Sequence, residues 1–176
     1  MTDGRSGPPA AARLHEWLLI GVIVALDQIT KQLVVRSLAV RESVTIIPGL
    51  LDFTHVRNTG AAFGLLNSVD FPGKTMVISG VALAALLVMA AYAAALPARQ
   101  KLARLGLALV LGGAAGNLID RIRQGYVVDY VDFYWRGWHF WAFNVADAAI
   151  TIGVGLVILD LLRPREEPAA VEARES

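Results

Sequence analysis

Four long apolar stretches divide the chain, and a more polar segment separates each from the next. They run from Trp17 to Val35, from Thr75 to Leu96, from Leu102 to Ile119 and from Phe143 to Leu162. The hydrocarbon core of a bilayer is about 30 Å thick and takes about 20 helical residues to cross, so each stretch is long enough to span it. The pattern predicts a mainly α, polytopic membrane protein with four transmembrane helices.

The segment between the first two apolar stretches has a different pattern. Two short runs typical of strands, Val44 to Ile47 and Leu51 to Val56, flank a turn at Pro48 and Gly49. We therefore expect a small β-sheet lying on the membrane between the first two helices. The connection between the third and fourth helices is rich in Tyr and Trp, residues that prefer the headgroup level of a bilayer, so we expect this connection to follow the interface.

Composition supports a membrane protein and narrows its chemistry. The chain has 176 residues, of which 56% are hydrophobic and 18% charged, with a mean hydropathy of +0.54. This is more apolar than a soluble domain requires. The absence of cysteine excludes a thiol nucleophile, a disulfide framework and a thiolate metal site. A net charge of +1, without runs of like charge, argues against a nucleic-acid partner.

The length favours a single domain with unstructured ends. Residues 1–13 are rich in Gly, Pro and Ala, and residues 163–176 are rich in charge. Neither segment has enough apolar residues to bury a core, so we expect both to be disordered. Residues 14–162 then form one integral membrane domain.

The first apolar stretch could instead be a cleaved signal peptide. The residues before it are only weakly basic, and Asp27 and Lys31 interrupt the run before any small-residue cleavage site. These features favour a permanent helix.

The distribution of Lys and Arg predicts the orientation in the membrane. The shortest connection, between the second and third helices, holds Arg99, Lys101 and Arg104, and short basic loops stay in the cytoplasm. We therefore expect both termini in the cytoplasm and the sheet on the extracytoplasmic side. Six arginines would then lie at the outer end and need a function or a partner: Arg36, Arg41, Arg57, Arg121, Arg123 and Arg136.

Polar residues within the helices gather at one end of the predicted bundle. In four antiparallel helices, the ends of the first and third meet the starts of the second and fourth. The residues concerned are Asp27, Lys31, Asn117, Asp120, Arg121, Asn144 and Asp147. Spacings of three or four place those of each helix on one face. Because an ionised side chain at mid-membrane costs about 2.5–3.5 kcal/mol, we expect all of them to face inward together.

A purely structural reading pairs Asp27 with Lys31 and Asp120 with Arg121 as contacts that hold helices together. Asp147 has no cation three or four positions away on its own helix, so this reading leaves it unpaired.

The natural partner of Asp147 is another acid in the adjoining connection, either Asp129 or Asp132. Two carboxyl groups brought close together cannot both ionise readily, so one keeps a proton. Such a pair can activate water for attack on a peptide bond and protonate the leaving amine. The pattern predicts an aspartyl protease, and the spacing leaves the choice between Asp129 and Asp132 open.

Other catalytic arrangements find less support. The sequence contains no HExxH or GxSxG motif, and His15, His55 and His139 lack metal-ligand spacing. We expect no metal or cofactor, and we expect His139 to be an interfacial residue. A dyad of Ser79 and Lys31 is conceivable, but a serine in an apolar helix commonly bonds its own backbone.

Five separated motifs carry a resemblance to a known family. They are DQITK at Asp27 to Lys31, NTGAAF at Asn58 to Phe63, GGAAGNLIDR at Gly112 to Arg121, VVD at Val127 to Asp129 and FNVAD at Phe143 to Asp147. Together, and in this order, they resemble the lipoprotein signal peptidase family, the bacterial signal peptidase II. The match extends over the four predicted helices.

The resemblance implies an aspartyl endopeptidase of the bacterial cytoplasmic membrane, with a β cradle on the outer side. Such enzymes remove signal peptides from prolipoproteins by cutting on the N-terminal side of a diacylglyceryl-modified cysteine. Prolipoproteins and membrane lipids are the implied partners, without an obligate protein partner. The implied catalytic residues are Asp129 and Asp147. Substrate-binding or supporting roles fall to Asn58, Gly60, Asn117, Arg121, Asn144, Asp27, Lys31 and Asp120.

One departure from the family pattern bears on the site. The loop reads VVDYVDF, so that Asp132 follows three residues after Asp129. The motif favours Asp129, with Asp132 as its replacement if the register differs. Two rival functions also stay open: an ion or proton pathway, which polar residues confined to one leaflet would serve poorly, and a non-enzymatic lipoprotein-binding module with an inactive acid pair.

Overall fold

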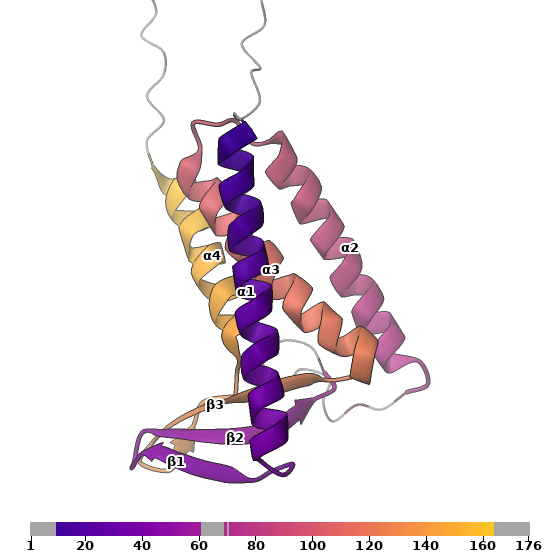
Figure 1. The fold of residues 1–176 in the computed structure, drawn as a ribbon, viewed down its shortest axis with the longest axis vertical. Coiled ribbons are helices and arrows are strands. Elements are labelled where there is room, and N and C mark those ends of the chain that lie inside the picture. Colours follow the sequence, from indigo (N-terminus) through magenta and orange to yellow (C-terminus); the bar gives the residue numbers. More distant parts are fainter. Residues whose placement is uncertain (1–9, 61–68, 70, 164–176) are drawn as a thin grey trace, which may run out of the picture.

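The structure is a computed structural model that describes residues 10–60, 69 and 71–163 (Figure 1). Of the two terminal segments expected to be disordered, residues 10–13 belong to the first helix, and nearly all the remaining residues lie outside the described ranges.

The described residues form four long helices, as predicted. They are α1 (Ala10–Ser37), α2 (Lys74–Ala95), α3 (Lys101–Gln124) and α4 (Val145–Leu162), and each is long and apolar enough to cross a membrane. The third helix continues past the expected end at Ile119 through a polar last turn. Gly125 ends it in a left-handed conformation with a φ of 81°, which glycine adopts without strain.

The third helix is the centre of the bundle. In its most apolar segment of 18 residues, 67% are buried, whereas the corresponding shares are 17% in α1, 17% in α4 and 0% in α2. Glycines allow the neighbouring helices to approach α3 closely. A Cβ atom at Gly113 would lie 2.3 Å from the carbonyl oxygen of Ala146 in α4, and one at Gly116 would lie 2.5 Å from Oδ2 of Asp27 in α1. These close approaches bring the polar end of α3 against both neighbours.

The sheet is larger than the sequence predicted. Its strands are β1 (Ser43–Ile47), β2 (Leu51–Asn58), β3 (Val127–Trp135) and β4 (Trp138–His139), in antiparallel order β1-β2-β3-β4. The hairpin around Pro48 and Gly49 is confirmed. The connection between α3 and α4, which we expected to follow the membrane interface, contributes β3 and β4, because its β-branched and aromatic residues also suit a strand.

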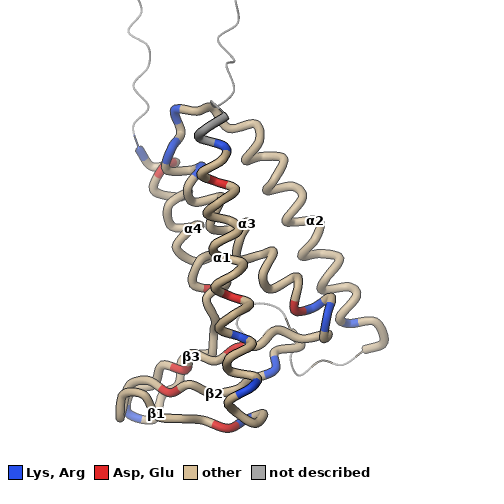
Figure 2. The backbone as a smooth tube through the Cα atoms, in the orientation of Figure 1, with Lys and Arg blue, Asp and Glu red and all other residues tan. Residues whose placement is uncertain are grey.

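The sheet lies at one end of the bundle. The start of α1 and the end of α4 lie at the other end, beside the connection between α2 and α3 (Figure 1). Charged residues gather toward the two ends, with long uncharged stretches of helix between them (Figure 2). A small apolar cluster of Val34, Val128 and Tyr130 joins the end of α1 to β3. The polar ends of the helices therefore meet the sheet, and the site forms at this junction.

Candidate active site

Lys31 is buried between two acids from different helices. Its Nζ lies 2.8 Å from Oδ2 of Asp27 in α1 and 2.9 Å from Oδ2 of Asp120 in α3. It also donates to Oδ1 of Asn117 at 2.8 Å. The expected pair of Asp27 and Lys31 is confirmed. The alternative pairing of Asp120 with Arg121 is wrong, because Asp120 faces Lys31 while the adjacent Arg121 points elsewhere.

Asp27 also connects α1 to the start of α4. Its Oδ1 accepts a hydrogen bond from the backbone N–H of Ala146 at 3.1 Å, and its side chain is fully buried. The first turn of α4 is thus fixed on the bundle by a carboxylate that Lys31 neutralises.

Asp147 lies in the first turn of α4 and takes part in a capping box. The N-cap residue Asn144 accepts from the backbone N–H of Asp147 at 3.0 Å, and Asp147 Oδ2 accepts from the backbone N–H of Asn144 at 3.2 Å. Asn117 Nδ2 donates to the other oxygen, Oδ1, at 2.9 Å. Within the described part of the chain, Asp147 forms no ion pair.

Asp129 lies in β3 with only 3% of its surface exposed. Asn144 Nδ2 donates to its Oδ1 at 2.7 Å, and Asn58 Nδ2 donates to its Oδ2 at 2.9 Å. Burial, followed by the nearby charge of Asp147, raises the pKa of Asp129 from 3.8 to about 7. Asn144 therefore bonds to both acids, through its oxygen to the backbone of Asp147 and through its nitrogen to the side chain of Asp129.

Asp132 lies away from this pair. His139 Nδ1 in β4 is 2.9 Å from its Oδ2. Because side chains alternate between the faces of a strand, Asp129 and Asp132 point to opposite faces of β3. The structure thus brings Asp129, and not Asp132, toward Asp147. The side chain of His139 is 56% exposed, and its place at the membrane interface stays a prediction.

Arg121 holds the segment that follows β2. Its Nη2 donates to the carbonyl oxygen of Gly60 at 3.0 Å, and the backbone N–H of Gly60 donates to Oδ1 of Asn58 at 2.9 Å. Asn58 in turn donates to Asp129. The residues of the NTGAAF motif that follow Gly60 lie outside the described residues.

Two residues of this region were missed by sequence reasoning. Gln28 donates to Oδ1 of Asp120 at 2.9 Å and to the carbonyl oxygen of Gly116 at 3.2 Å. Its place beside Asp27 in the DQITK motif was the available signal. Lys74 is buried at the start of α2, with Nζ 3.4 Å from Oγ1 of Thr59, and a cation opening an apolar helix could have indicated it.

The alternative dyad of Ser79 and Lys31 finds no support in the geometry. Lys31 Nζ already contacts the carboxyl groups of Asp27 and Asp120, and it donates to Asn117 rather than to Ser79. Ser79 Oγ is buried without a hydrogen-bond partner, so the backbone bond expected for it does not form. No group of three or more His, Cys, Asp or Glu side chains within the described ranges could hold a metal ion.

Four apolar helices, and a polar junction that holds one buried and one half-buried carboxyl group, define a multi-pass membrane protein with a site suited to acid–base chemistry. The sequence model for signal peptidase (SPase) II matches residues 19–163. The chain belongs to the signal peptidase II family, which confirms the resemblance given by the five motifs and indicates a protease.

Individual relatives agree with this assignment. The lipoprotein signal peptidase of Pasteurella multocida is 44% identical over 168 residues, which cover 96% of this chain and 97% of that protein. The lipoprotein signal peptidase of Geobacter metallireducens is 42% identical over 146 residues, covering 83% and 89%. A solved structure described as a bacterial membrane enzyme superposes with a TM-score of 0.74 at 29% identity, covering 86% of this chain and 94% of the other.

Proposed function

We propose that this protein is a membrane-embedded aspartyl endopeptidase that removes the signal peptide from diacylglyceryl-modified prolipoproteins, cutting on the N-terminal side of the lipidated cysteine. The observation that carries the proposal is the pair of carboxyl groups on either side of Asn144, the buried Asp129 and the half-buried Asp147. The names of the relatives, lipoprotein signal peptidases, support the class of substrate.

The reaction needs one carboxylate and one carboxylic acid. With its pKa raised to about 7, Asp129 still carries a proton in a large share of molecules at neutral pH. The ionised member of the pair takes a proton from water as the water oxygen attacks the scissile carbonyl carbon. The protonated member donates to the carbonyl oxygen, which gives a tetrahedral intermediate. As the C–N bond breaks, the proton taken from water passes to the nitrogen of the leaving peptide, and the hydroxyl of the intermediate returns its proton to the other acid as the carbonyl reforms. No covalent intermediate is needed.

The surrounding polar residues would orient this pair and the substrate. Asn117 holds one oxygen of Asp147, and Lys31 holds Asn117. Arg121 fixes the backbone at Gly60, beside the acid pair, where an extended peptide could lie. We assign Asn58, Asn144 and Asp120 to the same supporting set, since each bonds directly to a member of this network.

We also propose that the protein lies in the bacterial cytoplasmic membrane, with both termini in the cytoplasm and the acid pair toward the outer face. The basic connection between α2 and α3 lies at the same end of the bundle as the start of α1 and the end of α4, opposite the sheet, which supports this orientation. Acyl chains on the substrate, with about 0.8 kcal/mol for each buried methylene, would hold the cleavage site at the membrane surface. The substrate would then enter sideways from the bilayer.

Incubation of the purified protein with a diacylglyceryl prolipoprotein tests this function. We expect a gel shift to a shorter product whose N-terminal residue is the lipidated cysteine, as determined by mass spectrometry. The same precursor without its diacylglyceryl group should remain uncut. Cleavage at another bond would contradict the proposal, as would equal cleavage of both precursors. Binding without cleavage would favour the non-enzymatic module.

The pH dependence of cleavage should report the protonation of the acid pair. Because the pKa of Asp129 is raised to about 7, the pair loses its remaining proton as the pH rises through this value. We expect kcat/KM to fall by about tenfold per pH unit on the alkaline side. The measurement is a rate profile from pH 5 to pH 9, with far-UV circular dichroism to verify folding. A rate unchanged up to pH 9 would exclude a proton held by Asp129.

A further inference from the structure

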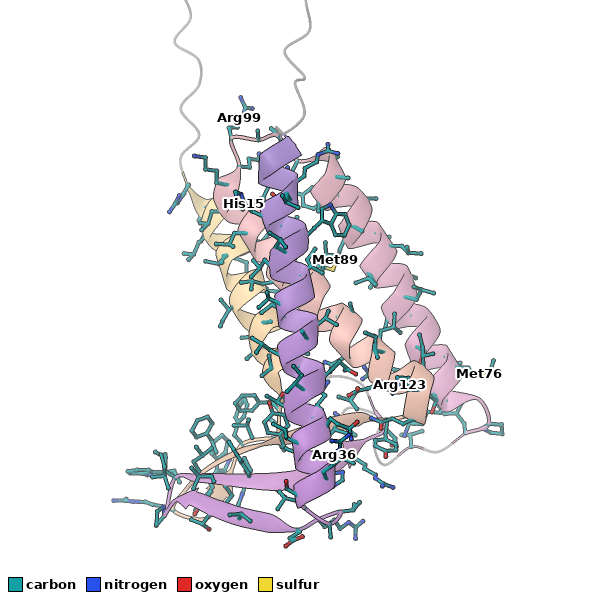
Figure 3. The ribbon with its side chains drawn as sticks, in the orientation of Figure 1. His15, Arg36, Met76, Met89, Arg99 and Arg123 are labelled. Atoms are coloured by element: carbon teal, nitrogen blue, oxygen red, sulfur yellow. The ribbon has the colours of Figure 1, made fainter. Side chains whose placement is uncertain are left out.

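A cavity of about 330 Å³ lies at the end of the bundle opposite the acid pair, between the start of α1 and the start of α3. Figure 3 labels His15 and Arg99 at this end. The lining residues come from α1, from the connection after α2 and from α3, and they are His15, Glu16, Leu19, Ala98, Lys101, Arg104 and Leu105. The cavity shares no residue with the site at the sheet.

The deepest charges of this cavity neutralise each other. Arg104 is buried, with 6% of its surface exposed, and its Nη2 lies 2.5 Å from Oε1 of Glu16. Its Nη1 donates to the carbonyl oxygen of Leu96 at 3.1 Å. A buried arginine with one acid and one carbonyl as partners keeps further N–H donors for a ligand. The pair also connects α1 to α3 at this end.

The rim of the cavity carries positive charge without an acid to neutralise it. Lys101 lines the cavity, and Arg99, in the connection just before α3, does not line it. Both are exposed, and neither forms an ion pair with any residue in the described ranges. Glu16, the acid in the cavity wall, is already paired with Arg104. The rim therefore attracts an anion.

The remaining wall is apolar and continues onto the outer surface of the helices. Leu19 and Leu105 line it, and Leu105 is 44% exposed. The neighbouring surface of α1 exposes Trp17 and Leu18 by 67% and 56%, as expected for residues that face lipid. A ligand that fits this site has an anionic head for the rim and a hydrocarbon chain for the wall.

We propose that this cavity binds one anionic phospholipid, with its phosphate on Lys101 at the rim and an acyl chain along Leu19 and Leu105. Basic pockets between transmembrane helices suit lipid phosphates, and phosphate contacts from cations are strong hydrogen bonds. The bound lipid would brace the junction of α1, α3 and the connection after α2. This site is independent of the protease activity proposed for the other end.

Thermal unfolding of the purified full chain in a neutral detergent tests the site with three additives: phosphatidylglycerol, phosphatidylcholine with the same acyl chains, and inorganic phosphate. We expect phosphatidylglycerol to raise the apparent Tm by several degrees, because a ligand that binds the folded state stabilises it. The other two should leave it nearly unchanged. Lys101→Glu should remove the shift. Glutamate at the first position of α3 suits the helix dipole, so folding should be preserved.

Arg163→Glu is the matched control. Arg163 is exposed at the end of α4, at the same end of the bundle but outside the cavity, and the substitution changes the charge equally. It should keep the shift with phosphatidylglycerol. If both variants lost the Tm shift equally, the lipid would be attracted by the overall positive charge of this end, and the proposed site would be overturned. A shift with phosphatidylcholine of the same size, or with phosphate alone, would overturn the anionic lipid as its ligand.

Discussion

Replacing either Asp129 or Asp147 with asparagine should abolish cleavage of the lipidated precursor, with a loss in kcat of about 10³-fold or more. An amide has nearly the same shape as a carboxyl group, but it can neither accept a proton from the attacking water nor donate one in the required cycle. Each carboxyl group accepts a hydrogen bond on both oxygens, and asparagine keeps one acceptor oxygen, so one of these two bonds can persist in each variant. The measurement is the initial rate of the gel shift with equal amounts of folded, membrane-inserted protein.

Asp132→Asn is the matched control for this loss, because it makes the same substitution on the same strand. Asp132 pairs with His139 at the surface of the sheet, so we expect the variant to keep most of the activity. An inactive Asp132→Asn together with an active Asp129→Asn would show that the loop supplies the other acid. Normal turnover by Asp129→Asn or Asp147→Asn would refute the mechanism.

Lys31→Met should cause the largest loss of stability. It leaves Asp27 and Asp120 buried without their shared cation, and breaking a buried ion pair from one side costs about 3–5 kcal/mol. Asn117 would also lose the donor that holds its Oδ1. We expect little folded protein in membranes and a lower apparent Tm in detergent, measured by size-exclusion chromatography and thermal unfolding.

Replacing Asp27 and Asp120 together with Lys31 shows whether the loss of stability comes from unpaired charge or from altered packing. In the triple variant that combines Lys31→Met with Asp27→Asn and Asp120→Asn, no buried charge is left uncompensated, so we expect much of the lost stability to return. A Lys31→Met protein as stable as the original chain would show that the cluster is open to water. A triple variant as unstable as Lys31→Met would show that packing, not charge, dominates.

The helices could be predicted from the sequence because a bilayer requires long apolar runs, whatever their partners. Which polar residues pair with each other depends on how the helices pack, and the spacing of residues along the sequence does not show this. Gly116 lets α1 and α3 approach at Asp27, and this approach places Asp120 on Lys31 rather than on its neighbour in sequence. The aromatic residues of the connection before α4 are typical of both a membrane interface and a strand. In the structure, the part that contains Asp129 forms a strand because it pairs with β2.

The choice between the two acids of that connection illustrates the same limit. Spacing alone does not choose between Asp129 and Asp132 as the partner of Asp147, and in the sequence only the family motif favoured Asp129. In the structure, the alternation of faces along β3 separates them physically, because it buries one and gives the other to His139. A strand assignment for the connection would have placed the two acids on opposite faces, but which face meets Asp147 depends on the packing of the sheet against the helices.

The double role of Asn144 affects when the acid pair can form during synthesis of the protein. The same side chain starts α4 and holds Asp129, so the acid pair cannot assemble before the last helix has formed and docked. An incomplete chain that has inserted only its first three helices would carry Asp129 without its partner. On the proposed mechanism, peptide cleavage would therefore begin only once α4 has docked, and copies without a docked α4 would be unable to cut neighbouring proteins in the membrane.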